Sequence, residues 1–163
     1  KGTTFRVYFP EVEGAHLPAA TSGAEAADTA AARGSGVVLL AEDDRAVRRL
    51  LSGELRRRGF TVLEARHGGE ALEICRRHAG PIDLLLTDVV MPTMNGVDLV
   101  AAARPLRPDM TILFMSGHPE RAGVGLDPQA AEAANLIMKP FTPDVVVSRI
   151  NELINAKSAA VER

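Results

Sequence analysis

Short apolar runs alternate along the chain with longer stretches in which apolar residues recur every three or four positions. Runs rich in Val, Ile and Leu are typical of buried strands, and the longer spacing is typical of the buried face of a helix. Five strands are expected, at residues 37–42, 61–65, 82–87, 111–116 and 135–138. Because helical patterns separate them, the sequence predicts an α/β protein of five βα units, with a doubly wound, five-stranded parallel sheet.

Glycine and proline mark the ends of the predicted helices. The first helix should stop at Gly59, the second at Gly80 and the third at Pro105, and the last should open at Thr142. Their buried faces are expected to carry Val47, Leu50, Leu51 and Leu55; Ala71, Leu72, Ile74 and Cys75; Val97, Leu99, Val100 and Ala103; and Val146, Ile150, Leu153 and Ile154. Several Gly and Pro residues in 117–128 leave room for only a short or distorted fourth helix.

Three of the predicted strands end in charged residues. Glu42, Asp43 and Asp44 follow the first strand, Asp88 the third and Lys139 the fifth. The carboxyl ends of parallel strands lie along one edge of a sheet, so four carboxylates and one ammonium are expected in a single cleft. Crowded carboxylates repel one another unless a cation joins them. The sequence therefore predicts a divalent-metal site with a lysine facing a bound anion.

Composition divides the chain near residue 36. Residues 4–10 alternate like a single strand, whereas 14–36 are rich in Ala and Gly and show no sustained period. The expected organisation is a terminal strand remnant at 1–13, a flexible linker at 14–36, the main domain at 37–156 and a tail at 157–163. Because the chain begins at Lys1 without a methionine, we expect it to be a piece of a longer protein.

Composition also limits the possible functions. The chain has 163 residues, 46% of them apolar, which is enough for one domain with a real core. A net charge of -2 without a basic stripe argues against nucleic-acid binding. Cys75 is the only cysteine, and no apolar run has the length of a membrane span. We expect a cytoplasmic monomer that contacts neither nucleic acid nor membrane.

The motifs at the strand ends resemble those of the receiver domain of two-component signalling, over roughly residues 37–156. They are Glu42-Asp43, Asp88-Val89-Val90-Met91-Pro92, Asn95-Gly96, Ser116 and Lys139-Pro140-Phe141. The resemblance implies a flavodoxin-like (βα)5 fold with the strand order 2-1-3-4-5. Residues 2–10 are similar to the closing strand of a histidine-kinase ATP-binding domain, which implies a hybrid sensor histidine kinase with its receiver at the C-terminus.

Asp88 is the predicted phosphoacceptor. A carboxylate at the mouth of a strand can attack phosphorus and become an acyl phosphate, provided that a metal neutralises the oxygens gathering around it. Mg²⁺ prefers oxygen ligands and keeps some of its waters. Asp43, Asp88 and the backbone carbonyl of Val90 would suit it, with Glu42 binding directly or through water.

Two further residues are expected to contact the phosphoryl group. Lys139 would pair with its charge, and the Ser116 hydroxyl would donate a hydrogen bond to one of its oxygens. The resemblance implies that Val90 and His118 occupy positions that tune hydrolysis. It also implies that Leu136 stands where many receivers have Tyr or Phe, so an aromatic switch is not expected.

The function that follows is that of a phosphoacceptor domain in a phosphorelay. It would take a phosphoryl group from a phosphohistidine of its own or another kinase, with a histidine phosphotransfer protein as a further partner. It would catalyse its own phosphorylation and its own slow dephosphorylation, while the parent chain would be a histidine kinase.

Two alternatives come from other classes. A flavin or corrinoid binder of the same fold lacks support, because no phosphate-cradling Gly-rich loop follows Leu40 and Val90 stands where the corrinoid motif needs His. A receiver-like module without phosphorylation conflicts with the retention of the full acidic and lysine set. A DNA-binding output is excluded for this chain, because only about seven residues follow the last predicted helix.

Overall fold

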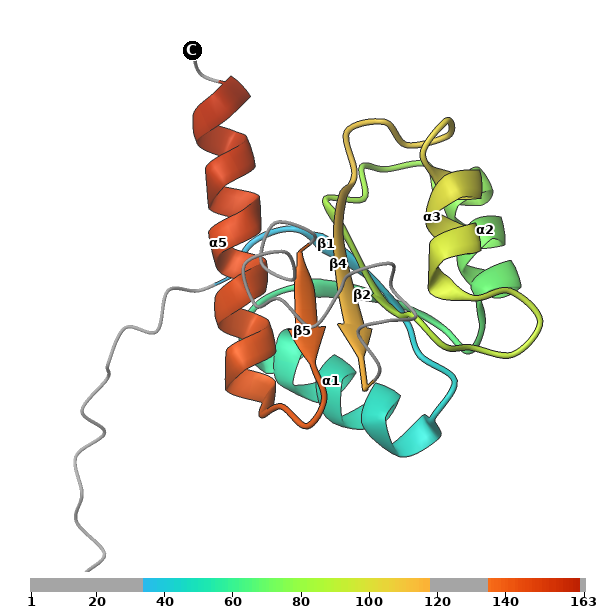
Figure 1. The fold of residues 1–163 in the computed structure, drawn as a ribbon. Helices are drawn as coiled ribbons and strands as arrows, with labels where there is room; N and C mark the ends of the chain where they lie inside the picture. The colour runs from blue at the N-terminus through green and yellow to red at the C-terminus, as the bar shows by residue number, and fades with distance from the viewer. Residues whose placement is uncertain (1–33, 118–134, 162–163) are drawn as a thin grey trace, which may run out of the picture.

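The computed structural model describes residues 34–117 and 135–161 (Figure 1). The strand expected at residues 4–10, most of the expected linker, His118 and nearly all of the irregular fourth-helix segment lie outside the described residues. Within the described ranges, none of the helices combines the length and the apolar character needed to cross a bilayer.

Five parallel strands form one sheet in the order β2-β1-β3-β4-β5. Their bounds are Val37–Ala41 for β1, Thr61–Ala65 for β2, Leu84–Asp88 for β3, Thr111–Ser116 for β4 and Leu136–Met138 for β5. Every residue of β3 is buried, as expected for a central strand that is covered on both faces. The predicted fold class and strand order are confirmed.

Among the described residues, two helices cover each face of the sheet. The helices are α1 at Arg45–Arg57, α2 at Gly68–Arg77, α3 at Gly96–Ala103 and α5 at Pro143–Val161. Helices α2 and α3 lie side by side over one face, and α1 and α5 lie over the other (Figure 1). Helix α1 ends just before Gly59, whose φ of +101° confirms the predicted left-handed stop.

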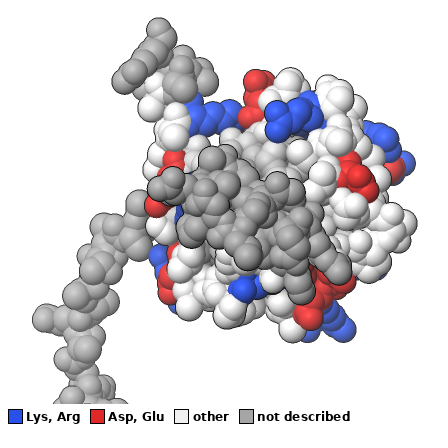
Figure 2. Space-filling view, in the orientation of Figure 1, with Lys and Arg blue, Asp and Glu red and all other residues white. Residues whose placement is uncertain are grey.

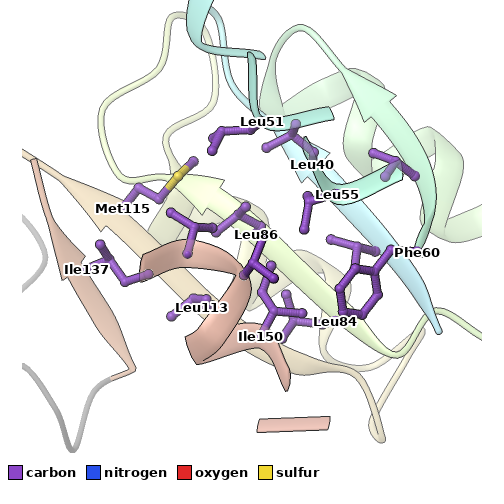
Figure 3. Close-up of a cluster of buried hydrophobic side chains, with 14 residues drawn as sticks. Leu40, Leu51, Leu55, Phe60, Leu84, Leu86, Leu113, Met115, Ile137 and Ile150 are labelled. Carbon is purple, nitrogen blue, oxygen red and sulfur yellow. The ribbon is translucent and has the colours of Figure 1, made fainter. Parts of the chain in front are cut away.

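The alternation of side chains along the strands divides the core in two. Leu84 and Leu86 of β3 point into the cluster beneath α1 and α5, whereas Leu85 points into the cluster beneath α2 and α3. Figure 3 shows the first cluster, where the strand leucines lie among Leu55 of α1 and Ile150 of α5. Burial on both faces therefore fixes β1 and β3, the strands that lead to Glu42 and Asp88.

Strand β3 begins later than the pattern predicts and includes the acidic residue at its end. The expected range was 82–87, but the strand starts at Leu84 and ends at Asp88. Asp83 has another role, because its Oδ2 accepts a hydrogen bond of 2.7 Å from the backbone N–H of Val37. This contact fixes the start of β1 against the start of β3.

Helix α2 is shorter than predicted. It ends at Arg77, three residues before the expected stop at Gly80. The guanidinium of Arg107 donates hydrogen bonds to the carbonyls of Cys75 and Gly80, each 3.0 Å long, and to the carbonyl of His78. A side chain distant in sequence thus satisfies the carbonyls that a longer helix would have used.

The folded unit extends slightly beyond the expected range of 37–156 at both ends. The N–H of Gly34 donates to the carbonyl of Arg58 (2.8 Å), and the carbonyl of Gly36 accepts from the N–H of Thr61 (3.0 Å). The last residues of the expected linker are thereby attached to the sheet. Helix α5 continues to Val161, past the tail boundary expected at residue 157. Alanine-rich sequence in its last turn favours this continuation.

Candidate functional site

The charged residues meet at the carboxyl edge of the sheet. Glu42 and Asp43 follow β1, Asp88 ends β3, Ser116 ends β4 and Lys139 follows β5. Strand β1 lies between β2 and β3, so the chain reverses its winding direction there. Open α/β sheets bind ligands at this type of switch point.

Three carboxylates form a compact acidic group. Glu42, Asp43 and Asp88 each offer one oxygen, and these oxygens all lie within 4.8 Å of one another. Glu42 is only 1% exposed and Asp88 8%, whereas Asp43 is exposed. An all-oxygen donor set that is buried on one side and open on the other suits a hard divalent cation that keeps some of its waters.

Asp44 does not join this group, so the expectation of four carboxylates in the cleft is wrong. Its Oδ1 accepts hydrogen bonds from the N–H groups of Ala46 (2.7 Å) and Val47 (3.1 Å) and caps the N-terminus of α1. These bonds, with the one from Val47 as the larger effect, lower the pKa of Asp44 below its ordinary value. The third acidic residue of the triplet therefore caps α1 instead of joining the acidic group.

Lys139 bridges two members of the acidic group. Its Nζ lies 3.0 Å from Oε2 of Glu42 and 2.5 Å from Oδ2 of Asp88. Its backbone N–H donates to the carbonyl of Ser116 (2.8 Å), which fixes the lysine beside the end of β4. Burial alone would lower the pKa of the Lys139 ammonium, but its hydrogen bonds to Asp88 and Glu42 outweigh that effect and raise the pKa above its ordinary value.

Glu42 is an ionisable group in an environment that penalises its charge. Burial raises the pKa of Glu42 above its ordinary value, although the ammonium of Lys139 acts in the opposite direction. Asp88 adds to the increase by like-charge repulsion. A further cation in the cleft would favour the ionised form of Glu42.

Backbone contacts fix the side chain of Asp88. The N–H of Val90 donates to Oδ1 of Asp88 (3.0 Å), while Oδ2 faces Lys139. The hydroxyl of Thr87 donates to the Asp88 carbonyl (3.0 Å). Gly96 packs so closely that a Cβ built there would lie 2.2 Å from the same carbonyl oxygen. The acceptor candidate is thus oriented by its neighbours before any ligand arrives.

The remaining predicted residues fall into three groups. Ser116 is fully buried at the end of β4, beside the lysine. Val90 is 43% exposed and its N–H contacts Asp88, and Leu136 is 8% exposed on β5, opposite Phe114 of β4. His118 lies outside the described residues. The structure therefore brings together the acidic group, Ser116 and Lys139, with Val90 at their edge.

Sequence reasoning missed Arg48. This residue is 9% exposed in the first turns of α1, and its guanidinium contacts the backbone of the acidic turn. The signal that could have found it was its position, because Arg48 lies on the same helical face as the buried Leu51 and Leu55. A charged residue on an apolar stripe needs a polar partner.

The fold and the site together define a class of protein. It is a doubly wound α/β domain that places three carboxylates and a lysine at the carboxyl edge of its sheet. Comparison with known proteins identifies the family: residues 38–151 match the response regulator receiver domain, and the chain belongs to that family.

Two curated relatives and one solved structure show how the match is distributed. The sensor kinase CckA of Brucella abortus (strain 2308) is 35% identical over 158 residues, which cover 94% of this chain and 17% of the kinase. The response regulator receiver protein CpdR of the same strain is 38% identical over 121 residues, covering 73% of this chain and 97% of that protein. The crystal structure of the receiver domain from the hybrid histidine kinase CckA has 33% sequence identity and a TM-score of 0.60, and the match covers 73% of this chain and 99% of that one.

The chain thus corresponds to a small part of the sensor kinase and to nearly the whole of the single-domain receiver. The charges of its surface are mixed: Figure 2 shows acidic and basic side chains interspersed over the described part of the visible face. This distribution agrees with the net charge of -2.

Proposed function

We propose that this receiver domain accepts a phosphoryl group from a phosphohistidine onto Asp88, in the presence of Mg²⁺. The observation that carries the proposal is the position of the Asp88 carboxylate. One of its oxygens is held by the N–H of Val90, the other faces the Lys139 ammonium, and two further carboxylates lie beside it. This geometry supports a role in which a carboxylate reacts where nearby cations neutralise the charge of the incoming group.

The proposed transfer is a displacement at phosphorus. An oxygen of Asp88 supplies the electron pair of the new P–O bond, the P–N bond of the donor breaks, and its electron pair remains on the imidazole nitrogen. Later attack by water on phosphorus breaks the P–O bond, releases inorganic phosphate and restores the carboxylate. Val90 N–H and Lys139 hold the Asp88 oxygens in position before the transfer.

Mg²⁺, when bound, would supply the positive charge that neutralises the oxygens around the phosphorus. Asp43 and Asp88 would hold it, with the carbonyl of Val90 and with Glu42 either directly or through water. The donor set supports this assignment, since its atoms are oxygens that lie close together.

Ser116 and Lys139 are the proposed readers of the phosphorylated state. The Ser116 hydroxyl would donate to a phosphoryl oxygen, and the lysine would exchange its present contact with Asp88 for one with the phosphoryl group. Both residues are joined through the hydrogen bond from Lys139 N–H to the Ser116 carbonyl. Movement of one therefore changes the constraint on the other, and Leu136 of β5 lies within the same strand pair.

The parent protein is proposed to be a hybrid histidine kinase of the cytoplasm that carries this domain. The alignment with the sensor kinase covers 94% of the chain, more than residues 34–163 alone could supply, so it includes residues before Gly34. This supports the assignment of the first segment to the kinase portion. The donor would be the phosphohistidine of that kinase, of another kinase or of a histidine phosphotransfer protein, with the domain acting as a monomer.

The test is intact mass after incubation with acetyl phosphate, with and without Mg²⁺. Wild type should gain a single phosphoryl group only in the presence of the metal. Asp88→Asn should gain none, because an amide cannot attack phosphorus in this way. Asp109→Asn, which changes an exposed aspartate elsewhere, is the matched control and should label like wild type. Undiminished labelling of Asp88→Asn would refute the assignment.

A further inference from the structure

Arg48 of α1 is a buried cation in an unexpected place. It is 9% exposed, although its side chain carries a permanent charge. It also lies near the N-terminus of a helix, where the helix dipole disfavours positive charge. A buried arginine in such a position needs compensating contacts, and those contacts indicate its role.

The contacts of Arg48 converge on the acidic turn after β1. Nη1 of Arg48 donates to the carbonyl of Glu42 at 2.7 Å and to the carbonyl of Asp43 at 3.3 Å. These carbonyls belong to the two residues whose carboxylates enter the acidic group. The guanidinium therefore holds the backbone of the turn through the carbonyls, leaving the carboxylates of both residues for the cleft.

The guanidinium is itself fixed from another element. Its Nε lies 3.8 Å from Oε2 of Glu64 on β2, and Oε1 of Glu64 lies 2.8 Å from Nη2 of Arg56. Glu64 partly neutralises the charge of Arg48 and limits its movement. The backbone N–H of Glu42 is held as well, by the carbonyl of Ala65 at 3.2 Å.

We propose that Arg48 is a positioning residue for the metal site, setting the directions in which Glu42 and Asp43 present their carboxylates. This inference rests on the proposed function, because it assumes that the acidic group binds Mg²⁺. Groups that orient metal ligands typically change metal affinity by about 10-fold to 100-fold when removed. A charge effect alone acts in the opposite direction, since removal of a nearby positive charge would tighten the binding of a dication.

Loss of positioning would weaken Mg²⁺ binding and loss of charge would tighten it, so Mg²⁺ affinity distinguishes the two effects. Mg²⁺ dissociation constants are measured by titration of the full chain for wild type, Arg48→Met, Arg48→Lys and Arg49→Met. Arg49 is the adjacent, exposed arginine, so its replacement removes the same charge from the same helix. We expect Arg48→Met to weaken Mg²⁺ binding by about 10-fold or more. Arg48→Lys should also weaken it, because lysine keeps the charge but loses the forked donor geometry. Arg49→Met should leave the affinity unchanged or slightly tighter, because it removes only a positive charge.

Two further measurements separate positioning from general stability. In metal-free protein, the amides of Glu42 and Asp44, which donate to the Ala65 carbonyl and to Oε1 of Glu42, should exchange faster in Arg48→Lys than in wild type, while amides of β3 should be unchanged. At saturating Mg²⁺, the rate of phosphorylation by acetyl phosphate should return to near the wild-type value. If Arg48→Met does not fold, Arg48→Lys and Glu64→Gln, which weakens the lateral anchor, supply the same comparison.

Mg²⁺ affinity that is unchanged or tighter in the Arg48 variants would overturn the inference, and so would slow phosphorylation that persists at saturating metal. These outcomes differ from failure of the proposed function. If wild type itself neither binds Mg²⁺ nor is phosphorylated, the function is wrong. If wild type does both and the Arg48 variants match it, only the role of Arg48 is wrong.

Discussion

The buried carboxylate of Glu42 lowers the stability of the fold when it is ionised. Its carboxylate is 1% exposed, and its pKa is raised chiefly by burial. A raised pKa means that the folded state binds the proton more tightly than the unfolded state does. The contribution of Glu42 to stability is therefore present below its unfolded pKa of about 4.5 and is lost as pH rises through the higher folded pKa.

Glu42→Gln should consequently stabilise the metal-free protein at pH 7, because it removes a buried charge and keeps a similar shape. The advantage over wild type should shrink as pH falls through the raised pKa of folded Glu42, because the carboxyl of wild type then becomes neutral. Urea denaturation in EDTA at several pH values measures this difference. Added Mg²⁺ should favour wild type more than the variant, since the amide is a weaker ligand. A Gln variant that is less stable at pH 7 in EDTA would contradict the prediction.

Gly96 is a position where a neighbouring backbone atom leaves no room for a side chain. A Cβ at this position would lie 2.2 Å from the carbonyl oxygen of Asp88, a backbone atom that cannot move aside easily. Gly96→Ala should cost about 1–3 kcal/mol of unfolding free energy through overpacking. It should also weaken Mg²⁺ binding, because Asp88 must shift.

Gly53 supplies the control for that variant. It lies exposed within α1, and a methyl group added there would meet nothing within 4 Å, so Gly53→Ala should stabilise the protein by up to about 1 kcal/mol. Urea denaturation gives both values, and a Mg²⁺ titration shows whether only Gly96→Ala affects the site. If both substitutions changed the unfolding free energy equally, the close contact between position 96 and Asp88 would not be the cause of a loss of stability.

At this scale most of the proposed site could be predicted from sequence. The acidic residues, Ser116 and Lys139 each follow or end a strand, and the sheet topology brings such positions together. The sequence could not show that Asp44 has a different role from Glu42 and Asp43. An aspartate after a strand suits both the capping of a helix and the binding of a metal. Which of the two roles Asp44 takes depends on the direction of the chain as it enters α1, and the sequence does not give that direction.

Among the elements, α2 depends most clearly on a residue from another part of the chain. Arg107 follows α3, yet its guanidinium donates to the carbonyls of Cys75, His78 and Gly80. It neutralises the negative end of the α2 dipole and joins the C-terminal ends of the two helices. No local signal in the sequence of α2 could have located its end at Arg77.

Replacement of Arg107 by Met should lower the unfolding free energy by about 1–3 kcal/mol, because partly buried carbonyls lose their donor. Arg104→Met removes an exposed arginine nearby and should change stability little. Neither substitution should affect Mg²⁺ affinity, since the acidic group lies at the opposite edge of the sheet. Hydrogen exchange should show the loss of protection concentrated at the end of α2. Uniformly increased exchange throughout the domain would argue against a local cap.

Helix faces were predicted better than helix ends. Leu51, Leu55, Val146 and Ile150 are buried as their spacing predicted. Leu50 and Val97 shared the same apolar pattern but are 58% and 43% exposed. An apolar stripe that is wider than the contact area with the sheet leaves its margins in solvent, and the width of that contact depends on neighbouring helices.

For the molecule as a whole, the first described residues are attached to the sheet and its helices. Gly34 and Gly36 bond to Arg58 and Thr61, and Gly34 lies directly against the ring of Phe60. A chain starting at Gly34 should therefore match the full chain in stability and in phosphorylation of Asp88. A chain starting at Val37 loses two hydrogen bonds and should be less stable by about 1–3 kcal/mol.

Thermal or urea denaturation of the full chain and both shortened chains tests this boundary. If the chain starting at Gly34 is already destabilised, residues 1–33 contribute to the fold. If the chain starting at Val37 matches the full chain, the contacts of Gly34 and Gly36 are dispensable. Phosphorylation by acetyl phosphate serves as the functional measure in each case.

The global fold was predictable because the same sequence pattern, an apolar run followed by a helical pattern, recurs along the chain. Five apolar runs separated by helical patterns allow few arrangements, and right-handed crossovers remove most of those. Strand order is different: it entered through the family resemblance, because the two common doubly wound orders share the same alternation of elements. The pairing of β1 with both β2 and β3 resolves it in the structure.

The ammonium of Lys139 has a final consequence for how the domain behaves when magnesium is scarce. The ammonium lies between Glu42 and Asp88, so it already neutralises part of the negative charge that a bound metal would neutralise. If the proposed function holds, a fall in magnesium would stop phosphorylation of Asp88, while the lysine would still balance part of the charge of the acidic group. Bound magnesium would add stability by mass action. In the proposed mechanism, the lysine would support the fold and magnesium would support the reaction. Under that proposal, the domain would stay folded without magnesium and would accept a phosphoryl group again once the ion returned.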